Sequence, residues 1–277
     1  MITKACDRAR RTIDPITMAK SAAITQLQTG VALGLTLGTA LGGIGIVTIG
    51  WKAFFVATAV VCFAMAWFIR NMPNPVPGDE RLPLGLAYRT VFSNPWAVLL
   101  FVLVFCEAGI LLGTFSLVPA SLETSGYTPT VAGLVTGSYG VAVLLTSVLV
   151  RRATQSVPPH HFIFYGGVAA ILGLAVVAFV LNEATAVISV LLQGASWVLM
   201  HTTLQTWVTA VTPRARATSV SLFAAFMFLG NGAGVYVASH LLADRGTSFL
   251  FGLAAVLMIA FTAVAVISQR RHYLSHD

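Results

Sequence analysis

Long apolar runs separated by short polar segments dominate the chain. Eight such runs are present, and within each run successive positions are apolar rather than alternate ones. They cover 22–46, 51–69, 96–118, 130–150, 162–180, 185–208, 219–242 and 248–267. A bilayer crossing requires about 20 apolar residues in a helix, whereas barrel strands alternate between apolar and polar residues. The pattern predicts an all-α polytopic membrane protein with eight transmembrane helices.

Basic residues fall on one side of the predicted membrane. Of the 16 Lys and Arg residues, 14 lie before the first run or after the second, fourth, sixth and eighth runs. The remaining two are Lys52, at the start of the second run, and Arg245, between the seventh and eighth runs. Positively charged loops stay in the cytoplasm, so we expect both termini to be cytoplasmic and the protein to reside in a cell (inner) membrane. One missed or added span would destroy this alternation, which supports the count of eight.

Composition supports a chain surrounded by lipid. It is 57% hydrophobic and only 9% charged, whereas a soluble protein is about 25% charged. The net charge of +7 follows from the loops, so no nucleic-acid partner is expected. The three cysteines form no CxxC motif, so neither a disulfide framework nor a zinc site is indicated. The charged N-terminal segment, which includes Asp7 and Asp14, does not resemble a secretory signal peptide.

Three motifs carry a family resemblance. Residues 34–43 read GLTLGTALGG, residues 51–55 read WKAFF, and HTTLQT at 201–206 is followed by PRARATSVSLF at 213–223. The first resembles GxxxGPxxGG, the antiporter signature of the fifth helix in the major facilitator superfamily, with Thr39 in place of proline. The second resembles WRxxF at the start of the sixth helix. The third resembles the tenth and eleventh helices of the drug:proton antiporter-like efflux permeases in that superfamily.

The resemblance implies an incomplete major-facilitator fold. It covers about residues 20–270 and matches the last eight of twelve helices, which leaves the first four missing. The implied organisation has five parts. These are a basic cytoplasmic segment (1–21), two helices of the N-terminal half (22–69), a cytoplasmic central loop (70–95), a complete C-terminal six-helix half (96–269) and a cytoplasmic tail (270–277). The family's cavity lies between its two halves, so a separate chain that supplies the missing helices is a further expected partner.

Glu107 is the sharpest chemical feature. It is the only carboxylate well inside a run, eleven residues after Trp96, and a charge at that depth costs about 2.5–3.5 kcal/mol on insertion scales. Intramembrane carboxylates usually mark proton relays or substrate paths. Glu107 is therefore predicted to couple protons or to bind a cationic group of the substrate; the alternative is a neutral acid that joins two helices by a hydrogen bond.

A polar ridge follows the sixth run. Gln193, Trp197, His201 and Gln205 recur at steps of four, and residues four apart are neighbours on a helix surface. We expect the ridge to line a substrate path, with His201 sharing a proton with Glu107 or with the substrate, because an imidazole titrates near neutral pH. The resemblance agrees, since the family's seventh and tenth helices line its cavity. The alternative is a histidine hydrogen-bonded across a packed interface.

Small residues indicate close helix packing. The first run has a ridge of glycines, which permit close helix packing. The family resemblance implies that its motif, at Gly34, Gly38, Thr39, Gly42 and Gly43, packs on 130–150. Asn231 lies among glycines in the seventh run and is assigned to the substrate path. A dinucleotide site is excluded there, because GxGxxG acts only between a strand and a helix. His160 and His161 are expected in a solvated loop rather than in a metal site.

These observations favour transport over catalysis. The leading hypothesis is proton-coupled efflux of a small amphipathic solute or drug, with the proton gradient as driving force and no cofactor. The expected partners are the small-molecule substrate and the lipid bilayer. The alternative is a truncated, non-transporting remnant or an assembly partner that needs another chain. An enzyme is disfavoured because no nucleophile motif, Walker loop or metal pair is present.

Overall fold

A computed structural model describes residues 15–71, 83–153 and 157–274, and it describes only a few side chains before Thr48. The described chain is helical and contains no strand, which confirms the all-α class. The elements in chain order are α2 (Pro15–Arg70), α3 (Leu84–Phe92), α4 (Pro95–Phe115), α5 (Val118–Thr124), α6 (Pro129–Ala153), α7 (Pro159–Phe179), α8 (Glu183–Ser196), the π-helix η1 (Trp197–His201), α9 (Thr202–Val211), the 3₁₀-helix η2 (Pro213–Ala215) and α10 (Arg216–Leu274).

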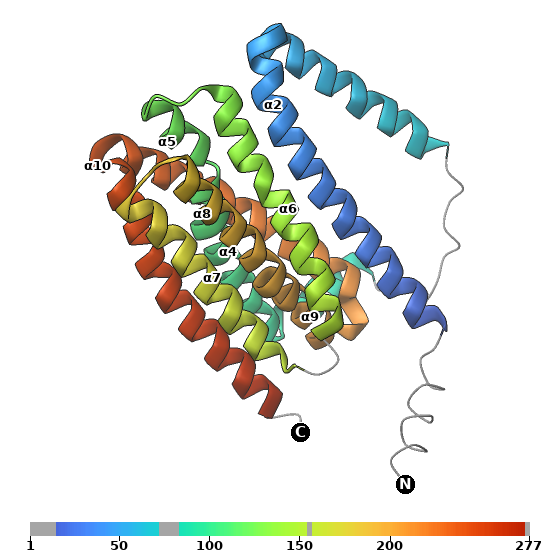
Figure 1. The fold of residues 1–277 in the computed structure, drawn as a ribbon. Coiled ribbons are helices and arrows are strands. Elements are labelled where there is room, and N and C mark those ends of the chain that lie inside the picture. Colours follow the sequence, from blue (N-terminus) through green and yellow to red (C-terminus); the bar gives the residue numbers. More distant parts are fainter. Residues whose placement is uncertain (1–14, 72–82, 154–156, 275–277) are drawn as a thin grey trace.

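Six helical stretches in the described chain are long and apolar enough to cross a membrane. They are Thr48–Arg70, Pro95–Thr124, Pro129–Val150, Pro159–Phe179, Glu183–Val211 and Pro213–His272. The last stretch contains two arms of α10 that meet at Gly246, where φ is 80°. The arms of α2 likewise meet at Gly50, where φ is 78°. Only glycine adopts such a φ readily, so these residues permit the sharp reversals in Figure 1. The count of eight crossings stays a prediction.

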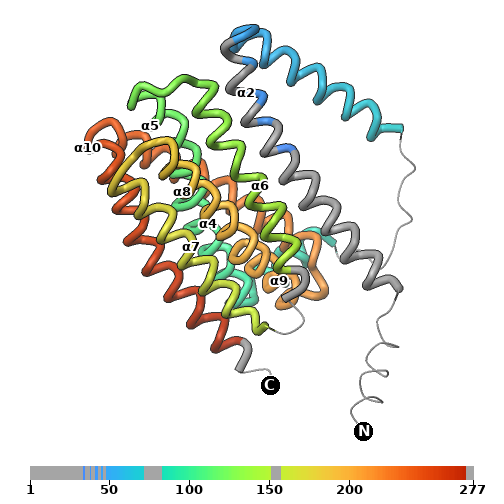
Figure 2. The backbone as a smooth tube through the Cα atoms, viewed as in Figure 1, coloured from blue at the N-terminus to red at the C-terminus, as the bar shows by residue number. Residues whose placement is uncertain are grey.

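The tightest helix contact joins α4 to the first arm of α10. Gly109 and Gly113 of α4 face Gly230 and Gly234 of α10, and a Cβ built on Gly113 would lie 2.9 Å from the carbonyl carbon of Gly234. Backbones can approach this closely only where side chains are absent. Helix α7 also packs on α10 and on α8, and α6 packs on α8. Together these helices form the bundle in Figures 1 and 2.

Helix α2 has one arm on the bundle and one arm off it. Its first arm (15–49) runs beside α6 (Figure 1), the helix on which the glycine motif is predicted to pack. Gly34 and Gly38, however, are exposed, and a Cβ added to either would meet no described atom within 4 Å. A Cβ on Gly42 would instead lie 3.8 Å from the Phe54 ring of the second arm. The side chains around Thr39 and Gly43 lie outside the described residues.

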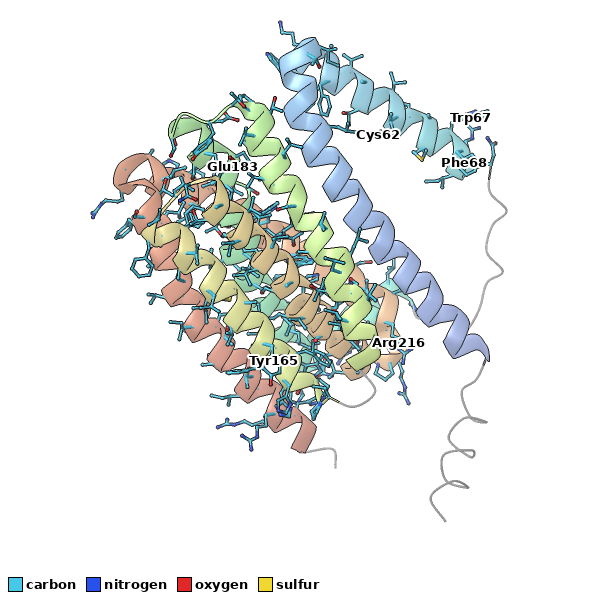
Figure 3. All side chains as sticks on the ribbon, viewed as in Figure 1. Cys62, Trp67, Phe68, Tyr165, Glu183 and Arg216 are labelled. Atoms are coloured by element: carbon cyan, nitrogen blue, oxygen red, sulfur yellow. The ribbon has the colours of Figure 1, made fainter. Side chains whose placement is uncertain are left out.

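The second arm of α2 (51–70) is apolar on every side. None of its membrane-length window is buried, and Phe63 and Trp67 are 77% and 69% exposed. Figure 3 shows Cys62, Trp67 and Phe68 on this arm, away from the bundle. A helix that is apolar all round is suited to lipid or to a protein interior.

The connection at 70–95, expected as a loop, contains α3. Its Ala87 and Val91, four residues apart, are buried, and the helix contacts α4 and η2. The short helix α5, after α4, was also not expected from the sequence. Nine and seven residues are too few for a spanning helix, so the hydrophobic runs gave no signal for either. The predicted division into five parts stays a prediction, and residues 72–82 lie outside the described chain.

A buried carboxylate–imidazole pair as the candidate functional site

Glu107 is positioned by a well-defined helix start. The Asn94 side chain caps α4 by accepting the backbone N–H of Trp96 at 3.0 Å, and Pro95 occupies the first turn. The Asn94 amide also donates to the carbonyl of Val211 at 2.8 Å, which ties the start of α4 to the end of α9. Glu107 then lies about 18 Å along α4 at 1.5 Å per residue. That position is near the middle of a hydrocarbon core about 30 Å thick.

The structure brings Glu107 and His201 together. His201 Nδ1 lies 2.9 Å from Glu107 Oε2. Glu107 is fully buried and His201 is 5% exposed. At this distance one proton is shared: either the imidazole N–H donates to the carboxylate, or the carboxyl O–H donates to the imidazole. The other carboxyl oxygen, Oε1, has no hydrogen-bond partner among the described residues.

Two aromatic rings contact the imidazole of His201. The Trp197 indole stacks on it with ring centroids 3.8 Å apart and an interplanar angle of 11°. Phe223 of α10 lies on it at 5.3 Å. These rings restrict the imidazole to one orientation and keep the pair in an apolar environment.

A π-helical turn carries both His201 and Trp197. The segment Trp197–His201 forms η1 between α8 and α9, so the sixth run is one α-helix interrupted by a wider turn. The predicted ridge assumed regular α-helix throughout, and the sequence carried no signal for the π-turn. Single π-turns inside α-helices occur frequently at functional sites.

The other residues predicted to line the substrate path, besides Trp197, are Gln193, Gln205 and Asn231. Gln193 is 2% exposed, and its amide donates to Ser189 Oγ at 3.0 Å, while its Oε1 has no partner in the described chain. Gln205 is half-buried on α9. Asn231 is half-buried on the first arm of α10, with a buried side-chain oxygen that no described group satisfies. The assignment of these residues to a substrate path stays a prediction.

His160 and His161 lie in the first turn of α7 rather than in a loop. Pro159 at the first helical position explains the difference, because its fixed φ suits a helix start. The two imidazole centroids are 4.3 Å apart. In the described part of the chain, no group of three or more His, Cys, Asp and Glu side chains is placed to hold a metal ion.

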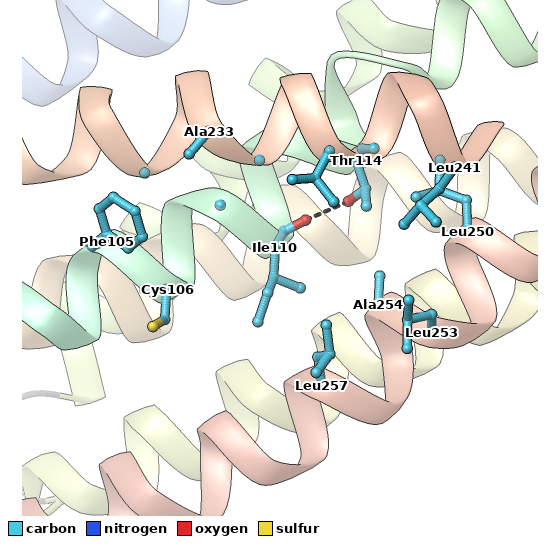
Figure 4. A pocket seen from close by; sticks show the side chains of 15 residues that line it. Phe105, Cys106, Ile110, Thr114, Ala233, Leu241, Leu250, Leu253, Ala254 and Leu257 are labelled. Carbon is cyan, nitrogen blue, oxygen red and sulfur yellow. Dashed lines mark hydrogen bonds between the residues drawn. The ribbon is translucent and has the colours of Figure 1, made fainter. Parts of the chain in front are cut away.

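A cavity of about 350 Å³ opens between α4 and the two arms of α10. Figure 4 shows Cys106 and Ile110 on one side and Leu253 and Leu257 on the other. Among the described residues of the lining, Thr114 alone carries a hydroxyl group, which already donates to the Ile110 carbonyl at 2.7 Å. The described side chains of this cavity therefore offer a ligand almost only apolar contacts.

Comparison with known proteins identifies the family. The family described as the Major Facilitator Superfamily matches residues 18–208 and, in a second alignment, residues 113–276. No curated protein matches the chain. The two matched ranges overlap and together reach almost from end to end of the chain. The family resemblance is thereby confirmed: the chain belongs to the major facilitator superfamily, whose members are membrane transporters and not enzymes.

Proposed function

We propose that this protein is a proton-coupled transporter that moves a small amphipathic solute out of the cell in exchange for protons. In this proposal the chain crosses an inner membrane eight times, with both termini in the cytoplasm. The observation that carries the proposal is the contact between Glu107 and His201. Two ionisable groups share a hydrogen bond in an apolar interior, where an unpaired charge is expensive.

The Glu107–His201 pair gives the exchange of protons for solute a physical basis. An ionised Glu107 requires compensation, and either a proton or a positively polarised group of the solute supplies it. The unpartnered Oε1 of Glu107 is the available acceptor. Occupancy by a proton and occupancy by the solute then exclude each other, which is the requirement for exchange. Trp197, stacked on His201, is placed to offer its ring face to the apolar part of the solute.

The second arm of α2 favours an alternative role. Its large apolar side chains are exposed all round, as expected for a helix that packs against another chain. In that case the protein is an assembly partner or a non-transporting remnant, and the separate chain supplies the helices that complete the cavity. Lipid contact explains the same exposure within the first proposal, so the two roles differ in whether the chain transports alone.

Flux through the purified chain tests the proposal. In liposomes that contain only this protein, we expect an imposed pH gradient to drive accumulation of the fluorescent amphipathic cation ethidium. A protonophore should abolish that accumulation, and protein-free liposomes provide the baseline. Accumulation that is equal with and without the gradient would contradict proton coupling. Absence of any flux from correctly folded protein would favour the assembly-partner role.

A further inference from the structure

A second cavity, of about 380 Å³, lies at one end of the bundle. Its walls come from the end of α6, the start of α7, the whole length of α9 and the end of α10. Figure 3 shows Arg216, which belongs to a predicted cytoplasmic segment, toward this end of the bundle. None of the described residues that line this cavity belongs to the Glu107–His201 pair.

Two buried polar groups in the lining have no hydrogen-bond partner among the described residues. Trp207 is 4% exposed and its indole Nε1–H donates to no described acceptor. Gln269 is 5% exposed and its Oε1 accepts from no described donor. Buried polar groups are nearly always hydrogen-bonded, so a donor and an acceptor left unsatisfied by the described residues of one cavity are available to a ligand.

Neighbouring aromatic rings hold the Trp207 indole in place. Its centroid lies 5.8 Å from that of Trp96 and 5.4 Å from that of His272, and the latter two rings are 4.9 Å apart. Trp96 is itself held at the capped start of α4. The orientation of the indole N–H is therefore determined by packing rather than by a ligand, as a pre-formed binding site requires.

The rest of the lining adds hydroxyl acceptors, apolar surface and the imidazole of His272. Thr203 and Thr206 donate their hydroxyl protons to carbonyls of their own helix at 2.7 Å, so their oxygens remain able to accept. Val150 and Phe162 provide apolar contact. No Asp, Glu, Lys or Arg belongs to the described lining, whose one titratable side chain is the imidazole of His272, so a cationic ligand would find no counter-ion among these residues.

We propose that this cavity is a binding site for small uncharged solutes that carry an amide or hydroxyl group on an apolar body. A primary amide has the matching pattern: its carbonyl accepts from Trp207 Nε1–H, and its N–H groups donate to Gln269 Oε1 and to a threonine oxygen. The apolar body contacts Val150 and Phe162. This site goes beyond the proposed function and does not depend on proton coupling.

Equilibrium binding of radiolabelled benzamide to the protein in nanodiscs tests the site, with empty nanodiscs subtracted. We expect saturable binding that weakens about tenfold in Trp207→Phe and in Gln269→Leu, since each variant removes one hydrogen bond. Trp67→Phe, at an exposed position on the second arm of α2, is the matched control and should bind as the wild type does. Trp207→Phe keeps an aromatic ring in the cluster, and an unchanged Tm shows that it has folded.

Two further ligands, toluene and benzoate, test which chemical groups the cavity binds. Toluene, which has no hydrogen-bonding group, should not saturate, and benzoate should bind more weakly than benzamide. Equal binding of toluene, tighter binding of benzoate, or benzamide binding unaffected by both variants would each overturn the proposal, as would no saturable binding. Glu107→Gln should retain benzamide binding, so a failure of this site and a failure of proton coupling give different results.

Discussion

Replacement of Glu107 by glutamine is expected to reduce pH-driven flux to the level of protein-free liposomes. Glutamine has the same shape and can still hydrogen-bond to His201 Nδ1, which lies 2.9 Å from the carboxyl oxygen in the native protein. It cannot release or bind a proton between pH 5 and 8. The variant should therefore fold, because a buried neutral group costs less than a buried charge, and should fail only in coupling.

Glu123→Gln is the matched control for this experiment. Glu123 is an exposed carboxylate at the end of α5, so its neutralisation should leave both flux and stability unchanged. The two variants should be compared in the same liposome preparation, by ethidium accumulation under an imposed pH gradient. Wild-type coupling in Glu107→Gln would remove this residue from the mechanism, whatever its structural role.

Gly234→Ala is expected to lower the free energy of unfolding by about 1–3 kcal/mol, the usual cost of overpacking. The added methyl group would meet the backbone of Gly109, closer than real Cβ atoms approach their neighbours. Backbone in a packed helix cannot move aside as a flexible side chain can, so α4 and α10 would have to separate. The thermal unfolding midpoint in detergent should fall accordingly.

Gly232→Ala provides the contrast on the same helix. A Cβ built there meets no described atom within 4 Å, and alanine is the better helix former by up to about 1 kcal/mol. The Tm should stay the same or rise. If both variants lowered the Tm equally, the loss would reflect general sensitivity of α10, and the glycine contact with α4 would not be its cause.

The broad architecture could be predicted because lipid imposes a simple rule on sequence. Crossing helices must be long and apolar, so hydrophobic runs located α4, α6 and α7 to within a few residues. Glu107 stood out for the same reason, as a lone carboxylate in such a run. Its suggested partner, His201, lies at hydrogen-bond distance, because ionisable groups inside a bilayer usually pair with one another.

Other features depended on packing, which hydropathy does not report. The π-turn at Trp197–His201 has no recognisable pattern in the local sequence. The short helix α3 is amphipathic rather than apolar, so Ala87 and Val91 gave no membrane signal. Glycine spacing indicated close contact but not its location: Gly34 and Gly38 are exposed, whereas Gly109 and Gly113 pack against Gly230 and Gly234.

The protonation state of Glu107 during solute binding is the most direct test of the central claim. Infrared difference spectra of the protein in lipid should show a carboxylic-acid C=O band that changes when ethidium is added, because solute and proton compete for the same carboxyl group. That band should be absent from Glu107→Gln. The same band change in both proteins, or no change in the wild type at concentrations that support flux, would contradict the account.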